Sequence, residues 1–291
     1  MSQPPECSGS GDLSIQEDRQ VALRRCVLGV SVIDGIDAFP DPDGVRLLDG
    51  IPMAIGWPEI DEAVGNINPD SARARTRLRM WFRLRSQLEA ISDVRGRARA
   101  MALPRGHALH PGADWARVTV PGGLIDLGVG LLGLLDDPDE VVVIPPALAR
   151  AANLPVEHWW PELVRELELT ARKAADRFSL DDNAPLRRFG DYDVVTLLAS
   201  SAFREVMCAV DPIGWRTAAV PMRHRGWLDL ARIDPAFAAA AALATEPDER
   251  GFSRAIIVTP EEVVLVPPGG KAAEHALLDP PVAHDPWVHR M

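Results

Sequence analysis

Apolar side chains recur every three or four residues within segment 71–99, which is the spacing of one face of an α-helix. These apolar positions are Leu78, Trp81, Leu84, Leu88 and Ile91. The residues just before the segment, 68–71, read Asn-Pro-Asp-Ser, and such side chains accept hydrogen bonds from the free N–H groups of a first helical turn. Gly96 weakens the C-terminal end of this predicted helix. The pattern therefore predicts a long helix that faces the core.

Helical spacing appears at several other places along the chain. Ser14 and Glu17 form a capping box, Pro161 suits the first turn of a helix, and Asp193 suits an N-cap. The additional helices are predicted at residues 14–25, 58–64, 146–152, 161–178 and 194–210, and in an alanine-rich stretch that starts at 234 and ends before Pro247.

Strand-like segments are short and come in pairs separated by turn residues. Three hairpins are predicted, at residues 45–57 around Asp49-Gly50, at 115–129 around residues 121–123, and at 255–266. Single strands are predicted at 26–33, 141–144 and 215–220. The expected fold class is α+β, with an antiparallel sheet built from hairpins and helices packed on one side or end. We expect the last hairpin to rejoin the first sheet.

The chain of 291 residues suits one domain over residues 13–266, and the alternative is a division near 140–146 into a strand-rich and a helix-rich half. Residues 1–12 and the tail 267–291 are polar or rich in proline and glycine, so we expect both to be loose. The start lacks the basic-then-apolar plan of a signal peptide. Pro121 and Asp126 interrupt the most apolar run, 118–135, so no membrane span is expected.

The three cysteines, Cys7, Cys26 and Cys208, are far apart and form no zinc or disulfide pattern. A reducing cytoplasm is therefore the expected compartment. The sequence also contains no P-loop, no Gly-x-Ser-x-Gly elbow and no dinucleotide-binding glycine motif. We therefore expect no cofactor.

Positive charge is concentrated in the predicted helix 71–99, although the whole chain carries a net charge of −11. The segment has nine arginines and two acids, a balance of about +7, which leaves about −18 for the rest of the chain. Arg75, Arg79 and Arg83 follow one another at intervals of four, opposite the apolar stripe. Arg77 and Arg85 fall near the apolar arc and must extend to water or to carboxylates.

Three interpretations of this helix compete. Its arginines pair with the acids of the chain itself, or they bind an acidic partner protein, or they bind nucleic acid. The strongly acidic remainder argues against nucleic acid.

Two weaker patterns carry candidate chemistry. His107, His110 and Asp114 have side chains that could hold zinc, but their glycine- and proline-containing segment lacks the rigid helix and glutamate of a zincin, so a polar loop is the simpler interpretation. Trp159 and Trp160 are adjacent and cannot both enter the same core from one helix, so one of them is a candidate contact residue.

The sequence thus favours a cytoplasmic interaction or regulatory protein without catalytic activity. We expect it to contact an acidic protein partner through Arg75, Arg79, Arg83 and Trp159. The first alternative is a hydrolase whose site, metal-dependent or not, combines His107, His110, Asp114 and His224. The second alternative is a nucleic-acid-binding protein that uses the helix 71–99. The sequence leaves the oligomeric state open.

Overall fold

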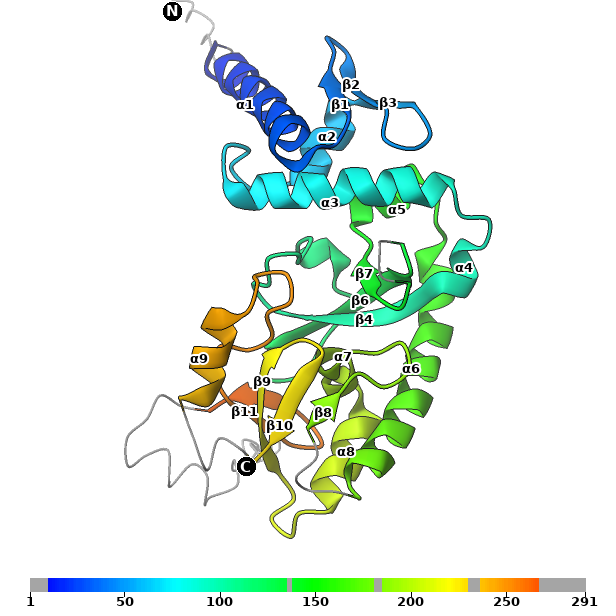
Figure 1. Cartoon of the computed structure of the whole chain (residues 1–291), viewed down its shortest axis with the longest axis vertical. Helices are drawn as coiled ribbons and strands as arrows, with labels where there is room; N and C mark the ends of the chain where they lie inside the picture. Colours follow the sequence, from blue (N-terminus) through cyan, green and yellow to red (C-terminus); the bar gives the residue numbers. More distant parts are fainter. Residues whose placement is uncertain (1–9, 135–137, 181–184, 230–235, 267–291) are drawn as a thin grey trace, which may run out of the picture. The chain divides into compact units, whose positions relative to one another are not determined.

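The computed structural model describes residues 10–134, 138–180, 185–229 and 236–266, with side chains from residue 17 onward. It contains helices and antiparallel sheets, so the α+β class is confirmed. The chain forms two compact units. Figure 1 labels helices and strands of both units. The first unit comprises residues 1–99, 111–115 and 129–160, and the second comprises 100–110, 116–128 and 161–291. The tail 267–291 and residues 1–9 lie outside the described residues.

The first unit begins with a long helix that packs on a second helix and a small sheet. Its helices are α1 (Ser10–Asp34), α2 (Trp57–Val64), α3 (Ala72–Glu89), α4 (Val94–Arg97) and α5 (Pro146–Ala151). The antiparallel sheet has the order β1 (Ala38–Pro40), β2 (Gly44–Leu47) and β3 (Met53–Gly56). Strands β2 and β3 are the predicted first hairpin, and Gly50 in its turn has a φ of 79°.

The prediction of a strand at residues 26–33 is wrong, because this segment continues α1. Ala22, Cys26 and Val30 are buried at intervals of four residues, which is a helical repeat. Val32 and Ile33 are apolar but exposed. Apolar residues on two sides of one helix made the segment resemble a dense strand.

A second sheet contains β4 (Ala98–Pro104), β6 (Ile125–Leu132) and β5 (Val118–Thr119) in that order, and β7 (Val141–Val143) pairs with β6. A 3₁₀ turn, η1 (Ala113–Trp115), precedes β5. The pairing of β5 with β6 confirms the second predicted hairpin.

The helices of the second unit are α6 (Val156–Phe178), which starts in the first unit, α7 (Val194–Ala199), α8 (Ser201–Ala209) and α9 (Phe237–Ala244). Its sheet has the order β12 (Val263–Leu265), β11 (Ile256–Val258), β9 (Arg216–Met222), β10 (Arg225–Leu228) and β8 (Leu186–Arg187). The third predicted hairpin is confirmed as β11–β12. It pairs with β9 and does not rejoin the first sheet.

Two helix boundaries differ from the prediction. α6 begins at Val156, so Pro161 stands inside the helix and not in its first turn. The predicted helix 194–210 is divided at Ser200, whose ψ of 130° is extended. The Ser200 hydroxyl accepts a hydrogen bond from the Phe203 N–H and thereby starts α8. Among the described residues, no helix combines the length and the apolar character that crossing a membrane requires.

Candidate functional site

The basic helix α3 is built as its sequence predicts at its start and on its inner face. The Ser71 hydroxyl accepts a hydrogen bond from the Ala74 N–H at 3.1 Å, which confirms the N-cap. Leu78, Trp81 and Leu84 are fully buried. The helix ends at Glu89, well before residue 99, and the three arginines at 95, 97 and 99 therefore lie outside α3. Six arginines remain on α3.

Arg75 and Arg79 share one carboxylate. Asp34, the last residue of α1, lies 3.3 Å from Nη1 of Arg79 and 3.7 Å from Nε of Arg75. The Asp34 side chain is nearly buried, whereas the side chains of Arg75 and Arg79 are 38% and 31% exposed. The pair of cations therefore fixes the end of α1 on α3 and still reaches solvent.

Arg77 and Arg85, which the sequence places near the apolar arc, do find acceptors. Arg77 donates to the Val64 carbonyl oxygen at 3.0 Å, and burial, followed by the charge of Arg73, lowers its pKa. Arg85 pairs with Glu89 and lies 3.9 Å from Glu59. Burial raises the pKa of Glu59, and Arg85 opposes this effect.

Arg83 and Arg73 differ from these four arginines. Neither makes an ion pair with any residue that the structure describes, and Arg73 is exposed while Arg83 is partly exposed. Trp159 and Trp160 lie near the start of α6, and both are half-buried. The four predicted contact residues, Arg75, Arg79, Arg83 and Trp159, all belong to the first unit. Their role in binding stays a prediction.

The two histidines of the predicted metal loop are buried in the second unit, where they make different contacts. His110 Nε2 lies 3.0 Å from Asp126 Oδ2, and the same carboxylate accepts a hydrogen bond from Thr119 at 2.6 Å. Arg105 Nε lies 3.5 Å from Asp126. The Asp126 carboxyl group is thus buried and contacts His110, Thr119 and Arg105. The sequence pattern indicated this residue only as an interruption of an apolar run, so it was not predicted as a site residue.

His107 accepts a hydrogen bond at Nδ1 from the Leu109 N–H. Burial lowers its pKa to about 3, with further lowering by Arg223 and His110, while the backbone of Asp248 and Arg250 partly offsets these effects. His107 is therefore a neutral imidazole at physiological pH. Its Nε2 atom is buried and has no hydrogen-bond partner among the described residues.

Asp114 and His224 do not join these histidines in a common metal site. Both side chains are exposed, and Asp114 belongs to the first unit, whereas His107, His110 and His224 belong to the second. Throughout the described part of the chain, no three His, Cys, Asp or Glu side chains gather as metal ligands would.

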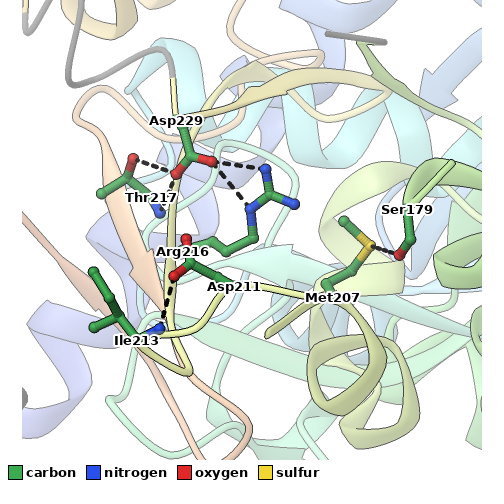
Figure 2. A network of polar contacts seen from close by, with 7 residues as sticks. All are labelled: Ser179, Met207, Asp211, Ile213, Arg216, Thr217 and Asp229. Carbon is green, nitrogen blue, oxygen red and sulfur yellow. Dashed lines mark hydrogen bonds and ion pairs between the residues drawn. The ribbon is translucent and has the colours of Figure 1, made fainter. Parts of the chain in front are cut away.

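The second unit also contains ion pairs of buried arginines that the sequence did not predict. Figure 2 shows Asp229 facing Arg216, with both Arg216 Nε and Nη2 directed at Asp229 Oδ2 at 3.0 and 2.7 Å. Thr217 donates its N–H and its hydroxyl to the other oxygen, both at 3.2 Å. Arg223 pairs in the same way with Asp193, the residue that caps α7. These pairs connect neighbouring elements of the second unit.

No protein-family model, curated protein or solved structure matches this chain.

Proposed function

We propose that this protein is a non-catalytic interaction protein, regulatory in role, that contacts an acidic protein partner through α3. The observation that supports the proposal is the positive charge left on α3 after internal pairing. Arg75 and Arg79 share the single carboxylate of Asp34, and Arg73 and Arg83 pair with none of the described carboxylates. A cationic helix of this kind attracts an acidic surface.

The chemistry of arginine suits a partner surface that presents carboxylates, and the net charge of −11 disfavours the phosphates of nucleic acid. A guanidinium group forms two parallel hydrogen bonds with one carboxylate, so it fixes geometry as well as charge. Arg75, Arg79 and Arg83 follow at intervals of four and lie on the same side of α3. Trp159 is half-buried and adds an aromatic contact from the same unit. We assign the protein to the reducing cytoplasm because its described cysteines, Cys26 and Cys208, are free thiols.

The test begins with native purification at low salt, followed by mass spectrometry of a stoichiometric co-purifying protein. Its affinity for the double variant Arg73→Glu/Arg83→Glu is then measured by titration calorimetry. We expect at least a tenfold loss, about 1.4 kcal/mol, and weakening with added salt. Arg83 lies on the proposed contact side of α3, and Arg73 adds the second α3 charge that pairs with none of the described carboxylates. Reversal at Arg75 or Arg79 would instead set a new carboxylate against Asp34.

The matched control is Arg172→Glu/Arg177→Glu, which changes the net charge of the chain by the same amount at exposed positions of α6. We expect this control to bind the partner as the wild type does. Equal loss in both variants would mean that only total charge matters and would contradict a docking role for α3.

A hydrolytic function is the second candidate, and the buried pair of His110 and Asp126 favours it. A carboxylate that orients an imidazole is the arrangement that general-base catalysis uses. Turnover of ester, amide or phosphoester substrates that is lost in His110→Gln would replace the non-catalytic proposal. Duplex DNA that binds and dissociates steeply with salt would instead support the nucleic-acid alternative.

A further inference from the structure

Two arginines of the second unit lie directly opposite each other at the edge of a sheet. Strand β8 is the last strand of the five-stranded sheet, and among the described strands it pairs with β10 alone (Figure 1). In this antiparallel register Arg187 is the partner of Arg225. The neighbouring partners, Leu186 and Gly226, are buried, whereas both arginines are exposed. The two arginine side chains therefore leave the outer face of the sheet on Cβ atoms about 5 Å apart.

The charge of this pair is not balanced within the described part of the chain, where neither Arg187 nor Arg225 forms an ion pair. Like charges at directly opposite positions destabilise an antiparallel pair of strands. The chain has 42 acidic and 31 basic side chains, so acids are not scarce. By contrast, Arg216 on β9 and Arg223 in the turn before β10 each have an aspartate partner. An anion from outside the chain would relieve the repulsion between Arg187 and Arg225.

The segment beside these strands does not supply that anion. Arg225 is also the partner of Met222 on β9, and Met222 forms a bridge with Arg250. Because opposite residues of a sheet share a face, Arg250 adds a third positive charge to the same row. The acids within 246–249 precede Arg250, but in the described residues they form no ion pair with Arg187 or Arg225. The row therefore contains three arginines and no acid.

Arg225 is held in position by an aromatic ring. Its guanidinium carbon lies over the face of the Trp227 ring, 5.4 Å from the centroid. Phe237 from α9 packs edge-on against the same ring, at a centroid distance of 5.1 Å and an angle of 89°. A cation over an aromatic face is attracted by the ring and keeps its N–H groups as hydrogen-bond donors. Arg225 is therefore positioned for an anion before one binds.

We propose that Arg187 and Arg225 bind the phosphate group of a phosphorylated side chain on a protein partner. A phosphate monoester carries a charge of about −1.5 to −2 and three acceptor oxygens, so one group balances both arginines. A carboxylate carries a single charge and balances only one. Exposure at a sheet edge lets a group on another protein reach both arginines, and the net charge of −11 disfavours the repeated phosphates of nucleic acid. This site lies in the second unit and is distinct from the contact proposed for α3.

Titration of the full chain with O-phosphoserine blocked at both ends tests the proposal, with amide NMR as the readout. The indole N–H of Trp227 and the amides of Arg187 and Arg225 report on the site, because Arg225 lies over the Trp227 ring. We expect saturable shifts with a dissociation constant of about 1–10 mM, as for a single small contact. Blocked glutamate should bind at least tenfold more weakly than blocked phosphoserine.

Three results of this titration would overturn the proposal. The first is equal binding of the two blocked amino acids, or no shift up to about 50 mM phosphoserine. The second is binding of inorganic phosphate at least tenfold tighter than that of phosphoserine, which would assign the site to the free ion. The third is the same preference for a single-stranded oligonucleotide, which would assign the site to nucleic acid.

A charge-neutral double variant tests the two residues themselves. Arg187→Gln/Arg225→Gln should weaken phosphoserine binding at least tenfold. The control Arg172→Gln/Arg177→Gln removes the same charge from exposed positions of α6 and should bind as the wild type does. Wild-type binding in the folded double variant would overturn the proposal, and so would an equal loss in the α6 control.

Two further measurements separate this site from a structural role and from α3. Arg187→Gln alone should keep or raise the Tm, because it removes one member of a like-charge cross-strand pair. A lower Tm would mean that Arg187 is paired within the chain and would overturn the proposal. Arg73→Glu/Arg83→Glu should bind phosphoserine as the wild type does, so the failure of one proposal is distinguishable from the failure of the other.

Discussion

Asp229 holds a buried guanidinium group in place, and its replacement gives the clearest stability prediction for the second unit. The side chain of Arg216 is 6% exposed and that of Asp229 is 26% exposed. Figure 2 shows that one oxygen of the carboxylate accepts hydrogen bonds from Arg216 and the other accepts them from Thr217. Its removal breaks the ion pair that Asp229 makes with this buried guanidinium group.

The expected cost of Asp229→Ala has two parts. Removing one partner of a buried ion pair costs about 3–5 kcal/mol, and the partial exposure of Asp229 favours the lower end of that range. Asp229 also has a φ of 55°, a left-handed conformation that costs alanine about 1 kcal/mol more than aspartate or asparagine. We therefore expect a total of about 4 kcal/mol.

Asp229→Asn separates these two parts. Asparagine tolerates the left-handed backbone and keeps oxygen and nitrogen atoms near Arg216 and Thr217, so only the charge is lost. We expect this variant to cost about 3 kcal/mol, which is the part that belongs to the ion pair, because its left-handed backbone is not strained. Arg216→Met/Asp229→Asn should be more stable than Asp229→Ala, since no buried charge remains.

Hydrogen exchange of the β9 amides in increasing urea measures these differences locally, which matters because the chain has two compact units. A loss below 1 kcal/mol in Asp229→Ala would refute the reasoning. So would equal losses in the alanine and asparagine variants.

Three further predictions concern single contacts of the second unit. The pKa of His107 in the folded chain is about 3, below the ordinary value of 6.5. As the pH falls, the unfolded chain therefore binds this proton first, and the free energy of unfolding should drop by about 2 kcal/mol between pH 6.5 and pH 5. Urea titrations at several pH values should show a smaller pH dependence of the free energy of unfolding in His107→Asn. Glu168 accepts hydrogen bonds from the Ser200 hydroxyl and the Ala202 N–H at the start of α8, and Glu168→Gln should cost about 1–2 kcal/mol in the same assay. Gly122 has a φ of 93° and its added Cβ would lie 2.1 Å from the Val263 carbonyl oxygen, so Gly122→Ala should cost about 2–3 kcal/mol and lower the Tm.

The elements that were predicted correctly are those that local chemistry determines. The three hairpins follow from turn residues that lie between two short apolar runs, as at Gly50. The start of α3 follows from Ser71, whose hydroxyl acts within its own helix. These signals depend on residues only a few positions apart, so a single sequence contains them.

The errors arise where tertiary packing decides the outcome. Residues 26–33 are rich in apolar residues on two sides, and only their packing within the first unit distinguishes a helix from a strand. The break at Ser200 depends on Glu168, 32 residues away, which accepts from its hydroxyl and from the first turn of α8. Neither contact has a local signature.

The candidate site shows the same limit. Its arginines were evident from the sequence, but the carboxylate that holds Arg75 and Arg79 belongs to Asp34, 45 residues before Arg79. The partner of His110 is Asp126 and not the nearby Asp114. Charge composition therefore located a basic helix, but only the fold separates its paired arginines from Arg73 and Arg83.

One affinity measurement tests the central claim most directly. The co-purifying protein is titrated into wild type, into Arg73→Glu/Arg83→Glu and into the control Arg172→Glu/Arg177→Glu, each at two salt concentrations. The account predicts at least tenfold weaker binding for the α3 variant alone, and wild-type binding that weakens with salt. Wild-type affinity in the α3 variant, with its fold intact, would contradict a docking role for this helix. It would leave the arginines of α3 as a purely structural feature of the first unit.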